Sequence, residues 1–234
     1  MPCFFQDNLL HNSFTLSADE SKHIKKSLRL KTGDFIWITD GKGTLAKATL
    51  TNILKESCTA EIIERNFYDI SKKRKLHLAV APTKNPDRME WMVEKAVEIG
   101  VDKISFIICD RSERKHLDLN RLQRVAVSAL KQSKGIWLPE LKIISLFQFL
   151  NDYKAINADK FIAYCNDKET VIKIANIKIQ QNDAIFLIGP EGDFTPQEIL
   201  FAKENGFQQI SLGEKILRTE TAALFATCWF SIIS

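Results

Sequence analysis

The segment from Phe186 to Glu198 has the residue types of a ligand-binding turn. An apolar run ends at Ile188, and Gly189 and Gly192 then allow the backbone to turn sharply and to approach a ligand closely. Thr195 begins a capping box with proline at the first helical position. The pattern predicts a strand, a glycine turn and a helix, and ligands of open α/β sheets bind at such turns. A plain strand-to-helix connection explains this segment, taken alone, equally well.

A second segment, from Ile210 to Ala223, has a comparable arrangement. A short apolar strand ends at Gly213, a tight loop follows, and a helix begins near Thr219. That helix is apolar on nearly every side, which is typical of burial, often by a partner subunit. Arg218 is a single cation just before the helix. Taken alone, it indicates an ion pair or a helix-end contact.

The composition is that of an ordinary globular protein. The chain has 234 residues, of which 45% are hydrophobic and 26% are charged, and this balance excludes a disordered chain. Neither the cysteines nor the four histidines have metal-ligand spacing, so we expect reduced thiols and no metal site. The N-terminus lacks the apolar run of a signal peptide, and no apolar segment is long enough to span a bilayer, so we expect a cytoplasmic protein. The cysteines are Cys3, Cys58, Cys109, Cys165 and Cys228.

The net charge of +4 comes from one short stretch. Basic and acidic residues balance in residues 1–70 and in residues 76–234, so the whole excess lies in Lys72–Lys75. Residues 18–31 and 111–134 are also locally basic. Basic patches of this kind suit a polyanion such as RNA, although each patch by itself is more often a solvated surface.

The first part of the chain has the pattern of a small β domain. Strand-like runs cover residues 13–16, 34–39, 44–54 and 57–64, and turn residues separate them. A capping box at Ser17–Glu20 opens one short helix. A small barrel or sandwich with one helix is the simplest arrangement of these elements.

The pattern changes after residue 72. Short apolar runs now alternate with amphipathic helical segments, which predicts a mostly parallel α/β sheet. Asn85 and Pro86 have the residue types of a helix start. We therefore expect two domains, residues 1–71 and residues 72–234. The predicted strands of the second domain cover residues 76–81, 103–108, 160–164 and 184–188.

Together, the two glycine-containing segments resemble the signature motifs of the RsmE family of SPOUT methyltransferases. Gly189-Pro190-Glu191-Gly192 before a capped helix matches the first motif. Leu212-Gly213 together with Ile216 to Ala222 matches the second motif, which is long and specific. Weaker agreements extend the similarity along the whole chain, at His23 to Arg29 with Gly33, at Glu94 to Gly100, and at Gln132-Ser133 before Pro139.

The resemblance implies an enzyme that methylates N3 of a uridine in 16S ribosomal RNA of the small subunit, with S-adenosylmethionine as methyl donor. It implies an N-terminal PUA-like β-barrel domain that binds RNA and a C-terminal α/β domain whose chain forms a trefoil knot. It also implies a homodimer with donor sites near the subunit interface. Knots are nearly absent from proteins, so the periodicity of the sequence alone could not suggest one.

In this family the donor lies bent among the knot loops. The resemblance therefore places it against mostly apolar residues with free backbone groups, which suit an adenine ring. The expected donor-binding residues are Leu187, Ile188, Gly189, Pro190, Glu191, Gly192, Leu212, Gly213, Ile216, Leu217, Arg218, Thr221 and Ala222.

Methyl transfer to uracil N3 requires that N3 lose its proton, since the protonated nitrogen is a poor nucleophile. A nearby cation lowers the pKa of a group that becomes negative, and Arg218 is our hypothesis for this cation. Glu191 or Glu220 could accept the proton, and either could equally be a structural partner of Arg218.

For RNA we predict two groups of contacts. One comes from the N-terminal helix and the other from the carboxyl edge of the predicted sheet, and phosphate contacts of this kind give a steep salt dependence. The predicted residues are Lys22, Lys26, Arg29, Lys84, Arg111, Arg114 and Gln132.

Three positions depart from the pattern of the family. Asp193 stands where a second glycine is usual, Lys131 where a glutamate is usual, and Gly135 where an arginine is common. Aspartate tolerates unusual backbone dihedral angles better than most residues do.

Three other functions are compatible with the sequence. A protein of this fold that only binds RNA would have no need of the intact Leu212–Ala222 motif. A related knotted methyltransferase would act on another target, such as a ribose 2′-hydroxyl. An unrelated α/β enzyme would bind a phosphorylated metabolite at residues 189–192. Such a function would not explain the basic N-terminal helix.

Overall fold

The computed structural model describes residues 1–54, 57–164 and 171–233, so Cys165 lies outside the described residues. The chain forms two compact units. The first comprises residues 1–72 and 127–138, and the second comprises residues 73–126 and 139–234.

Residues 127–138 belong with the first unit because their backbone is bonded to a turn of that unit. The N–H of Leu138 donates to the carbonyl of Gly41 at 2.9 Å, and the N–H of Gly43 donates to the carbonyl of Ile136 at 2.9 Å. A side chain at Gly43 would collide with the ring of Trp137, so this close approach requires glycine. The pattern of the sequence gave no sign of this packing, and the division into domains at residue 72 stays a prediction.

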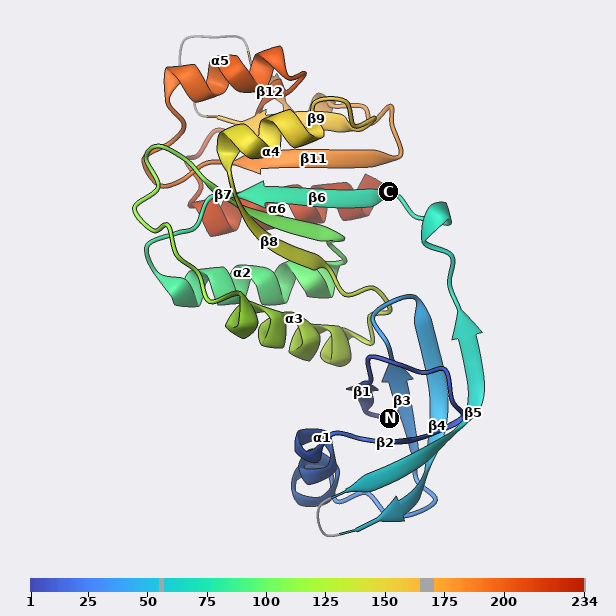
Figure 1. Ribbon diagram of the computed structural model, residues 1–234. Helices are drawn as coiled ribbons and strands as arrows, with labels where there is room; N and C mark the ends of the chain where they lie inside the picture. Colours follow the sequence, from blue (N-terminus) through green and yellow to red (C-terminus); the bar gives the residue numbers. More distant parts are fainter. Residues whose placement is uncertain (55–56, 165–170, 234) are drawn as a thin grey trace. The chain divides into compact units, whose positions relative to one another are not determined.

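The first unit is built on a curled five-stranded sheet with the order β1-β3-β4-β5-β2 (Figure 1). Strand β1 pairs with β3 in parallel, and the other pairs are antiparallel. The four predicted strands are confirmed as β2 to β5, whereas β1 was not predicted. The bounds are β1 (Cys3–Phe5), β2 (Ser13–Thr15), β3 (Phe35–Thr39), β4 (Thr44–Ile53) and β5 (Cys58–Phe67).

One face of this sheet packs on the predicted N-terminal helix. Buried residues alternate with more exposed ones along β4, as in a sheet that covers a core with one face only. Ile24 of the helix is fully buried in that core. The core includes Phe4, Leu9, Leu16, Ile24, Ile36, Ile38, Ala48, Leu50, Cys58 and Ala60.

The helix consists of α1 (Ala18–Lys22) and a π-helical segment η1 (His23–Leu28). The Ser17 hydroxyl accepts a hydrogen bond from the N–H of Glu20 at 3.3 Å, so half of the predicted capping box is confirmed. The other half does not form, because the Glu20 carboxylate pairs with Lys131 at 2.7 Å. Lys131, one of the departures from the family, thus connects the end of α3 (Leu119–Ser133) to α1.

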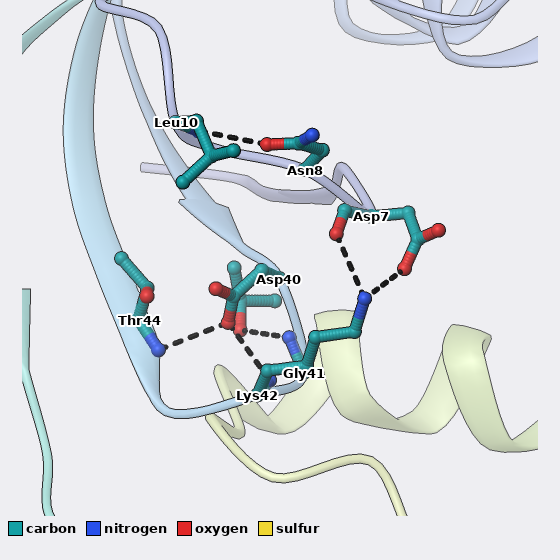
Figure 2. Close-up of polar contacts among 8 residues, drawn as sticks. Asp7, Asn8, Leu10, Asp40, Gly41, Lys42 and Thr44 are labelled. Atoms are coloured by element: carbon teal, nitrogen blue, oxygen red, sulfur yellow. Dashed lines mark hydrogen bonds and ion pairs between the residues drawn. The ribbon is translucent and has the colours of Figure 1, made fainter.

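The turn between β3 and β4 is organised by two aspartates, as Figure 2 shows. Asp40 Oδ1 accepts hydrogen bonds from the N–H groups of Lys42, at 2.8 Å, and of Thr44, at 2.9 Å. Lys42 Nζ pairs with Asp7 Oδ1 at 2.8 Å. Short polar side chains that bond to nearby backbone groups stabilise turns of this kind, which explains why residues 40–43 form the predicted turn.

The second unit is built on a seven-stranded sheet with the order β10-β12-β9-β11-β6-β7-β8, in which every pair is parallel. This confirms the predicted parallel α/β sheet. The strand bounds are β6 (Lys75–Val80), β7 (Lys103–Ile108), β8 (Glu140–Ser145), β9 (Asp159–Ala163), β10 (Ile172–Lys173), β11 (Asp183–Ile188) and β12 (Gln208–Ser211).

Helices cover both faces of this sheet, with α4 in front of it and α6 behind it in Figure 1. Alternate residues of the central strands, such as Leu187, pack with Phe149 of α4 and Ile199 of α5. On the opposite face Phe186 contacts Trp229 of α6, edge to face, with 6.0 Å between the ring centroids. The helices are α2 (Pro86–Ile99), α4 (Leu146–Tyr153), α5 (Pro196–Glu204) and α6 (Thr219–Ile233), with short 3₁₀ turns η2 (Ile70–Lys72) and η3 (Ile174–Asn176).

Asn85 begins α2 as predicted, since its side chain accepts from the N–H of Asp87 and Pro86 occupies the first turn. Gly100 ends the helix with φ 109°, a value that favours glycine. Within the described parts of the chain, no helix is both long and apolar enough to cross a membrane.

Candidate functional site

The order of the strands indicates a candidate site at the carboxyl ends of β6 and β11. These two strands are neighbours, yet the strand that follows β6 lies on one side of the pair, and β12, which follows β11, lies on the other. Ligands of open α/β sheets bind outside the carboxyl ends of the strands at such a reversal. Both glycine-containing segments identified in the sequence follow strands of this half of the sheet, β11 and β12.

The first of them, residues 189–194, is a compact turn. The N–H of Asp193 donates to the carbonyl of Pro190 at 2.9 Å, and Asp193 has φ 60°. Its carboxylate accepts from the N–H of Phe194 at 2.8 Å. Aspartate thus adopts the left-handed conformation for which the family's usual glycine is suited. A Cβ at Gly189 would lie 3.0 Å from the buried ring of Phe194, which explains the glycine there.

The capping box that follows this turn is confirmed. Thr195 Oγ1 accepts from the N–H of Glu198 at 3.2 Å, and Glu198 Oε2 accepts from the N–H of Thr195 at 2.7 Å. Glu198 is fully buried, and its other oxygen accepts from the N–H of Asp110 at 2.9 Å. The cap therefore also binds the loop that follows β7.

The second segment, residues 212–218, meets the first at the start of α6. Thr219 Oγ1 donates to the carbonyl of Gly189 at 2.9 Å, and this hydrogen bond is buried. Gly213 has φ 145°, and its N–H is held by the hydroxyl of Ser211 at 3.3 Å. The start of α6, which directly follows the second segment, is thus in contact with the first turn, as a shared ligand site requires.

The residues predicted for donor binding differ in exposure. Leu187 to Pro190, at the end of β11 and the start of the first turn, are buried, whereas Glu191 and Gly192 are exposed. In the second segment Ile216 is 87% exposed and Arg218 is exposed. Thr221 is exposed and Ala222 is buried.

Each of the two candidate proton acceptors has a partner other than Arg218. Glu191 Oε1 accepts from the N–H of Lys84 at 3.2 Å. Glu220 is 6% exposed and pairs with Nε of Arg88, on α2, at 3.6 Å. Its second oxygen, Oε2, is buried without a hydrogen-bond partner among the residues that the structure describes.

The residues predicted to contact RNA fall into two groups. Lys22, Lys26, Arg29 and Gln132 are exposed in the first unit. In the second unit the cations are engaged with the backbone: Arg111 Nη1 donates to the carbonyl of Gly192 at 2.9 Å, and Arg114 Nε donates to the carbonyl of Lys84 at 3.1 Å. The Lys84 ammonium is exposed and pairs with Glu113 at 3.1 Å.

Thr219 lies within the motif that the sequence places against the donor, but sequence reasoning did not assign a site role to Glu198, Asp110 or Arg88. Glu198 had a local signal, since it belongs to a capping box. Asp110 and Arg88 had no such signal. No cluster of three or more histidine, cysteine or acidic residues able to hold a metal ion occurs within the described residues.

Comparisons with known proteins match this architecture over the whole chain. A family model described as an RNA methyltransferase domain matches residues 71–231, and one described as an RNA methyltransferase PUA domain matches residues 16–63. The chain is 32% identical over 227 residues to a ribosomal RNA small subunit methyltransferase E of Mesomycoplasma hyopneumoniae, covering 95% of each chain.

Two solved structures are also similar. A probable rRNA-methyltransferase from Porphyromonas gingivalis is 37% identical, with a TM-score of 0.91, and 100% of this chain and 98% of that chain are covered. The ribosomal RNA small subunit methyltransferase E from Neisseria gonorrhoeae, bound to S-adenosyl methionine, is 31% identical with a TM-score of 0.89 and the same coverage. The chain therefore belongs to the RNA methyltransferase family, with a PUA domain before the methyltransferase domain.

Proposed function

We propose that this protein transfers the methyl group of S-adenosylmethionine to N3 of a uridine in 16S ribosomal RNA. The observation that carries the proposal is the buried hydrogen bond from Thr219 to the carbonyl of Gly189, which joins the two family motifs at the carboxyl ends of the strands. The relatives named small subunit methyltransferase E support the substrate, and the relative bound to S-adenosyl methionine supports the donor.

The residues at the two turns fit this donor. The N–H groups of Glu191 and Gly192 have no hydrogen-bond acceptor within the described residues, so they are available to a ligand. Ile216 presents a large exposed apolar side chain in the second motif, where burial by a ligand would be favourable. Donor binding would involve Leu187 to Gly192, Leu212, Gly213, Ile216 to Arg218, Thr221 and Ala222.

In the proposed reaction, the donor supplies an activated methyl group to the deprotonated nitrogen. Arg218 stabilises the uracil anion, since a guanidinium next to the base lowers the pKa of N3. The exposure of Arg218 at the start of α6 supports this role. As proton acceptor, the exposed Glu191 is better supported than Glu220, which is buried beside Arg88.

The exposed cations Lys22, Lys26 and Arg29 in the first unit, with Gln132, are proposed to contact RNA, and so is Lys84 in the second unit. Neutralising phosphates with such residues releases counterions, so the logarithm of the RNA affinity will fall with the logarithm of the salt concentration. An affinity that does not change across a salt titration would contradict this assignment.

We also propose the finer features that the family suggests: a β-barrel in residues 1–71, a trefoil knot in residues 72–234, and a cytoplasmic homodimer. The position of β11 between β6 and β9 supports a crossed chain path. The dimer is supported by an exposed face of α6, where Phe225 is 43% and Ile232 is 83% exposed. Phe225→Glu would place a charge on this face, and light scattering would then show monomers.

The function is tested with purified protein, S-adenosylmethionine and small ribosomal subunits that lack the modification. Mass spectrometry of the digested RNA should detect 3-methyluridine, whereas a 2′-O-methyl nucleoside would contradict the proposed target. In a second assay, Arg218→Ala should lower the turnover by about a hundredfold or more if its cation stabilises the anion, as removal of a comparable stabilising group does in other enzymes. Donor binding, measured by calorimetry, should weaken much less than turnover does, and turnover near wild type would exclude Arg218 as a catalytic residue.

A further inference from the structure

Arg111, in the loop after β7, lies directly against residues 189–194, the turn that is proposed to bind the methyl donor and is called the donor turn below. Its Nη1 donates to the carbonyl of Gly192 at 2.9 Å. A Cβ at Gly192 would lie 3.4 Å from the Cβ and 3.6 Å from the Cδ of Arg111, so the arginine side chain runs along the glycine. A hydrogen bond from a charged donor is stronger than one between neutral groups.

The backbone on each side of Arg111 is itself held in place. The N–H of Cys109 donates to Ser112 Oγ at 3.0 Å, and the N–H of Ser112 donates to the carbonyl of Cys109 at 3.1 Å, which closes a tight turn. The N–H of Asp110 donates to the buried carboxylate of Glu198. This turn and the cap of α5 therefore form one bonded unit, from which the Arg111 side chain reaches the donor turn.

Arg111 completes the set of contacts that orient the donor turn. The carbonyl of Gly189 accepts from Thr219, that of Pro190 accepts from the N–H of Asp193, and that of Gly192 accepts from Arg111. The carbonyl of Pro190 shares a peptide plane with the N–H of Glu191, and the carbonyl of Gly192 shares one with the N–H of Asp193, so these bonds fix the backbone on both sides of the Glu191–Gly192 peptide. A site with pre-oriented donors binds its ligand more tightly, because less freedom is lost on binding.

We propose that Arg111 is a positioning residue of the methyl-donor site, which sets the affinity for S-adenosylmethionine through the carbonyl of Gly192. This inference rests on the proposed function. It replaces the role of an RNA contact that the charge pattern predicts for Arg111, since the guanidinium is already engaged with the donor turn.

A matched control is available on the same loop. Lys115 carries the same charge and is exposed, and it lies only four positions further along the chain. Lys115→Ala removes one positive charge, as Arg111→Ala does, but leaves the bond to Gly192 intact. The difference between the two variants therefore separates the hydrogen bond from the charge.

The experiment measures donor binding by calorimetry for the full-length wild type, Arg111→Ala, Arg111→Lys and Lys115→Ala. Loss of a charge-assisted hydrogen bond should raise the Kd for S-adenosylmethionine about tenfold or more in Arg111→Ala. The lysine still carries a donor, so Arg111→Lys should show a smaller rise. Lys115→Ala should bind the donor as the wild type does. In turnover assays, the KM for the donor should rise in Arg111→Ala while kcat at saturating donor changes little.

Two further measurements separate positioning from a general loss of structure or from RNA binding. Hydrogen exchange of the backbone amides of residues 189–194 should be faster in both Arg111 variants than in Lys115→Ala, while exchange in the β7 strand stays unchanged. The salt dependence of RNA binding should be the same for Arg111→Ala as for the wild type.

A donor affinity within twofold of wild type in both Arg111 variants would overturn the inference, as would a salt slope that falls by about one in Arg111→Ala. If Arg111→Ala does not fold, the affinity and loop exchange of Arg111→Lys decide. Failure of the wild type itself to bind S-adenosylmethionine would instead contradict the proposed function.

Discussion

The turn after β11 and the segment after β12 both follow buried strands, but their surroundings differ. In residues 189–194, two carbonyl groups and the Glu191 carboxylate accept hydrogen bonds from other parts of the unit, and a third carbonyl accepts one from within the turn. In residues 212–218, the side chains from Glu214 to Ile216 are exposed, and the ion pair of Glu214 with Lys173 is a long 3.8 Å contact at the surface. One side of the site is thus fixed before a ligand binds, whereas the other presents uncovered side chains.

This difference suggests a division of roles. A fixed turn orients backbone donors without further loss of freedom, and an exposed apolar segment gains free energy only when a ligand covers it. Substitutions in the first turn should therefore act on both stability and binding. Substitutions in the second segment should act on binding alone.

The largest effect is expected at Glu198, the buried carboxylate behind the first turn. Glu198→Ala leaves the N–H groups of Thr195 and Asp110 without their acceptor, and burying unpaired polar groups should lower the free energy of unfolding by about 3 kcal/mol. The exposed Glu214→Ala in the second segment should change it by less than about 0.5 kcal/mol. Urea denaturation measures both values, and equal effects would refute the distinction between the segments.

Acidic pH should lower the stability of the second unit, which holds the first turn. His77 of β6 lies beside β11, and its Nε2 is 2.7 Å from Ser105 Oγ. Burial, with the added repulsion of Lys103 and Lys142, lowers the pKa of His77 from 6.5 to about 3. The folded state therefore holds His77 neutral, while the unfolded state takes up a proton below pH 6.5, so acidification favours unfolding.

From this pKa difference, the contribution of His77 to the free energy of unfolding should fall by about 2 kcal/mol between pH 8 and pH 5. In His77→Gln this part of the pH dependence should be lost. Denaturation curves at several pH values measure it. An unchanged slope in the variant would show that His77 is not responsible.

The contact between the two segments should have a smaller effect. Thr219→Val keeps the shape of the side chain but removes the hydroxyl that donates to the carbonyl of Gly189, at a cost of about 1–2 kcal/mol in the free energy of unfolding. Thr221→Val, at an exposed position of the same helix, should have little effect on stability. If the two variants unfold at the same urea concentration, the buried bond does not join the segments in solution.

The smallest effect on stability, close to zero, is expected for Ile216→Ser, because this side chain is already 87% exposed. If the donor covers Ile216, the variant should bind S-adenosylmethionine about tenfold more weakly, in line with the loss of about 1.5 kcal/mol of apolar burial. Calorimetry gives the affinity and thermal unfolding the stability. Unchanged binding would show that the second segment does not cover the donor with this residue.

Local patterns in the sequence predicted elements well where the contacts are local. The capping box at Thr195 and Glu198, the start of α2 at Asn85 and the turn at residues 40–43 all formed, because their hydrogen bonds join residues at most four positions apart. The capping box at Ser17 formed only in part, because the Glu20 carboxylate pairs with Lys131, 111 residues further along the chain. A distant ion pair of this kind leaves no trace in a local pattern.

The sequence by itself determined most of the strands and helices (though not β1, β8, β10 or α4), the parallel sheet of the second unit and, through its two motifs, the family. The tertiary structure decided which residues meet: Lys84 with Glu191 across 107 positions, Asp110 with Glu198 across 88, and Arg111 with Gly192 across 81. The order of strands in a sheet depends on the packing of the whole unit, and residue type and spacing report only on the nearest neighbours along the chain. For that reason the sequence showed Arg111 only as one cation of a basic stretch, and its bond to the carbonyl of Gly192 became visible only in the structure.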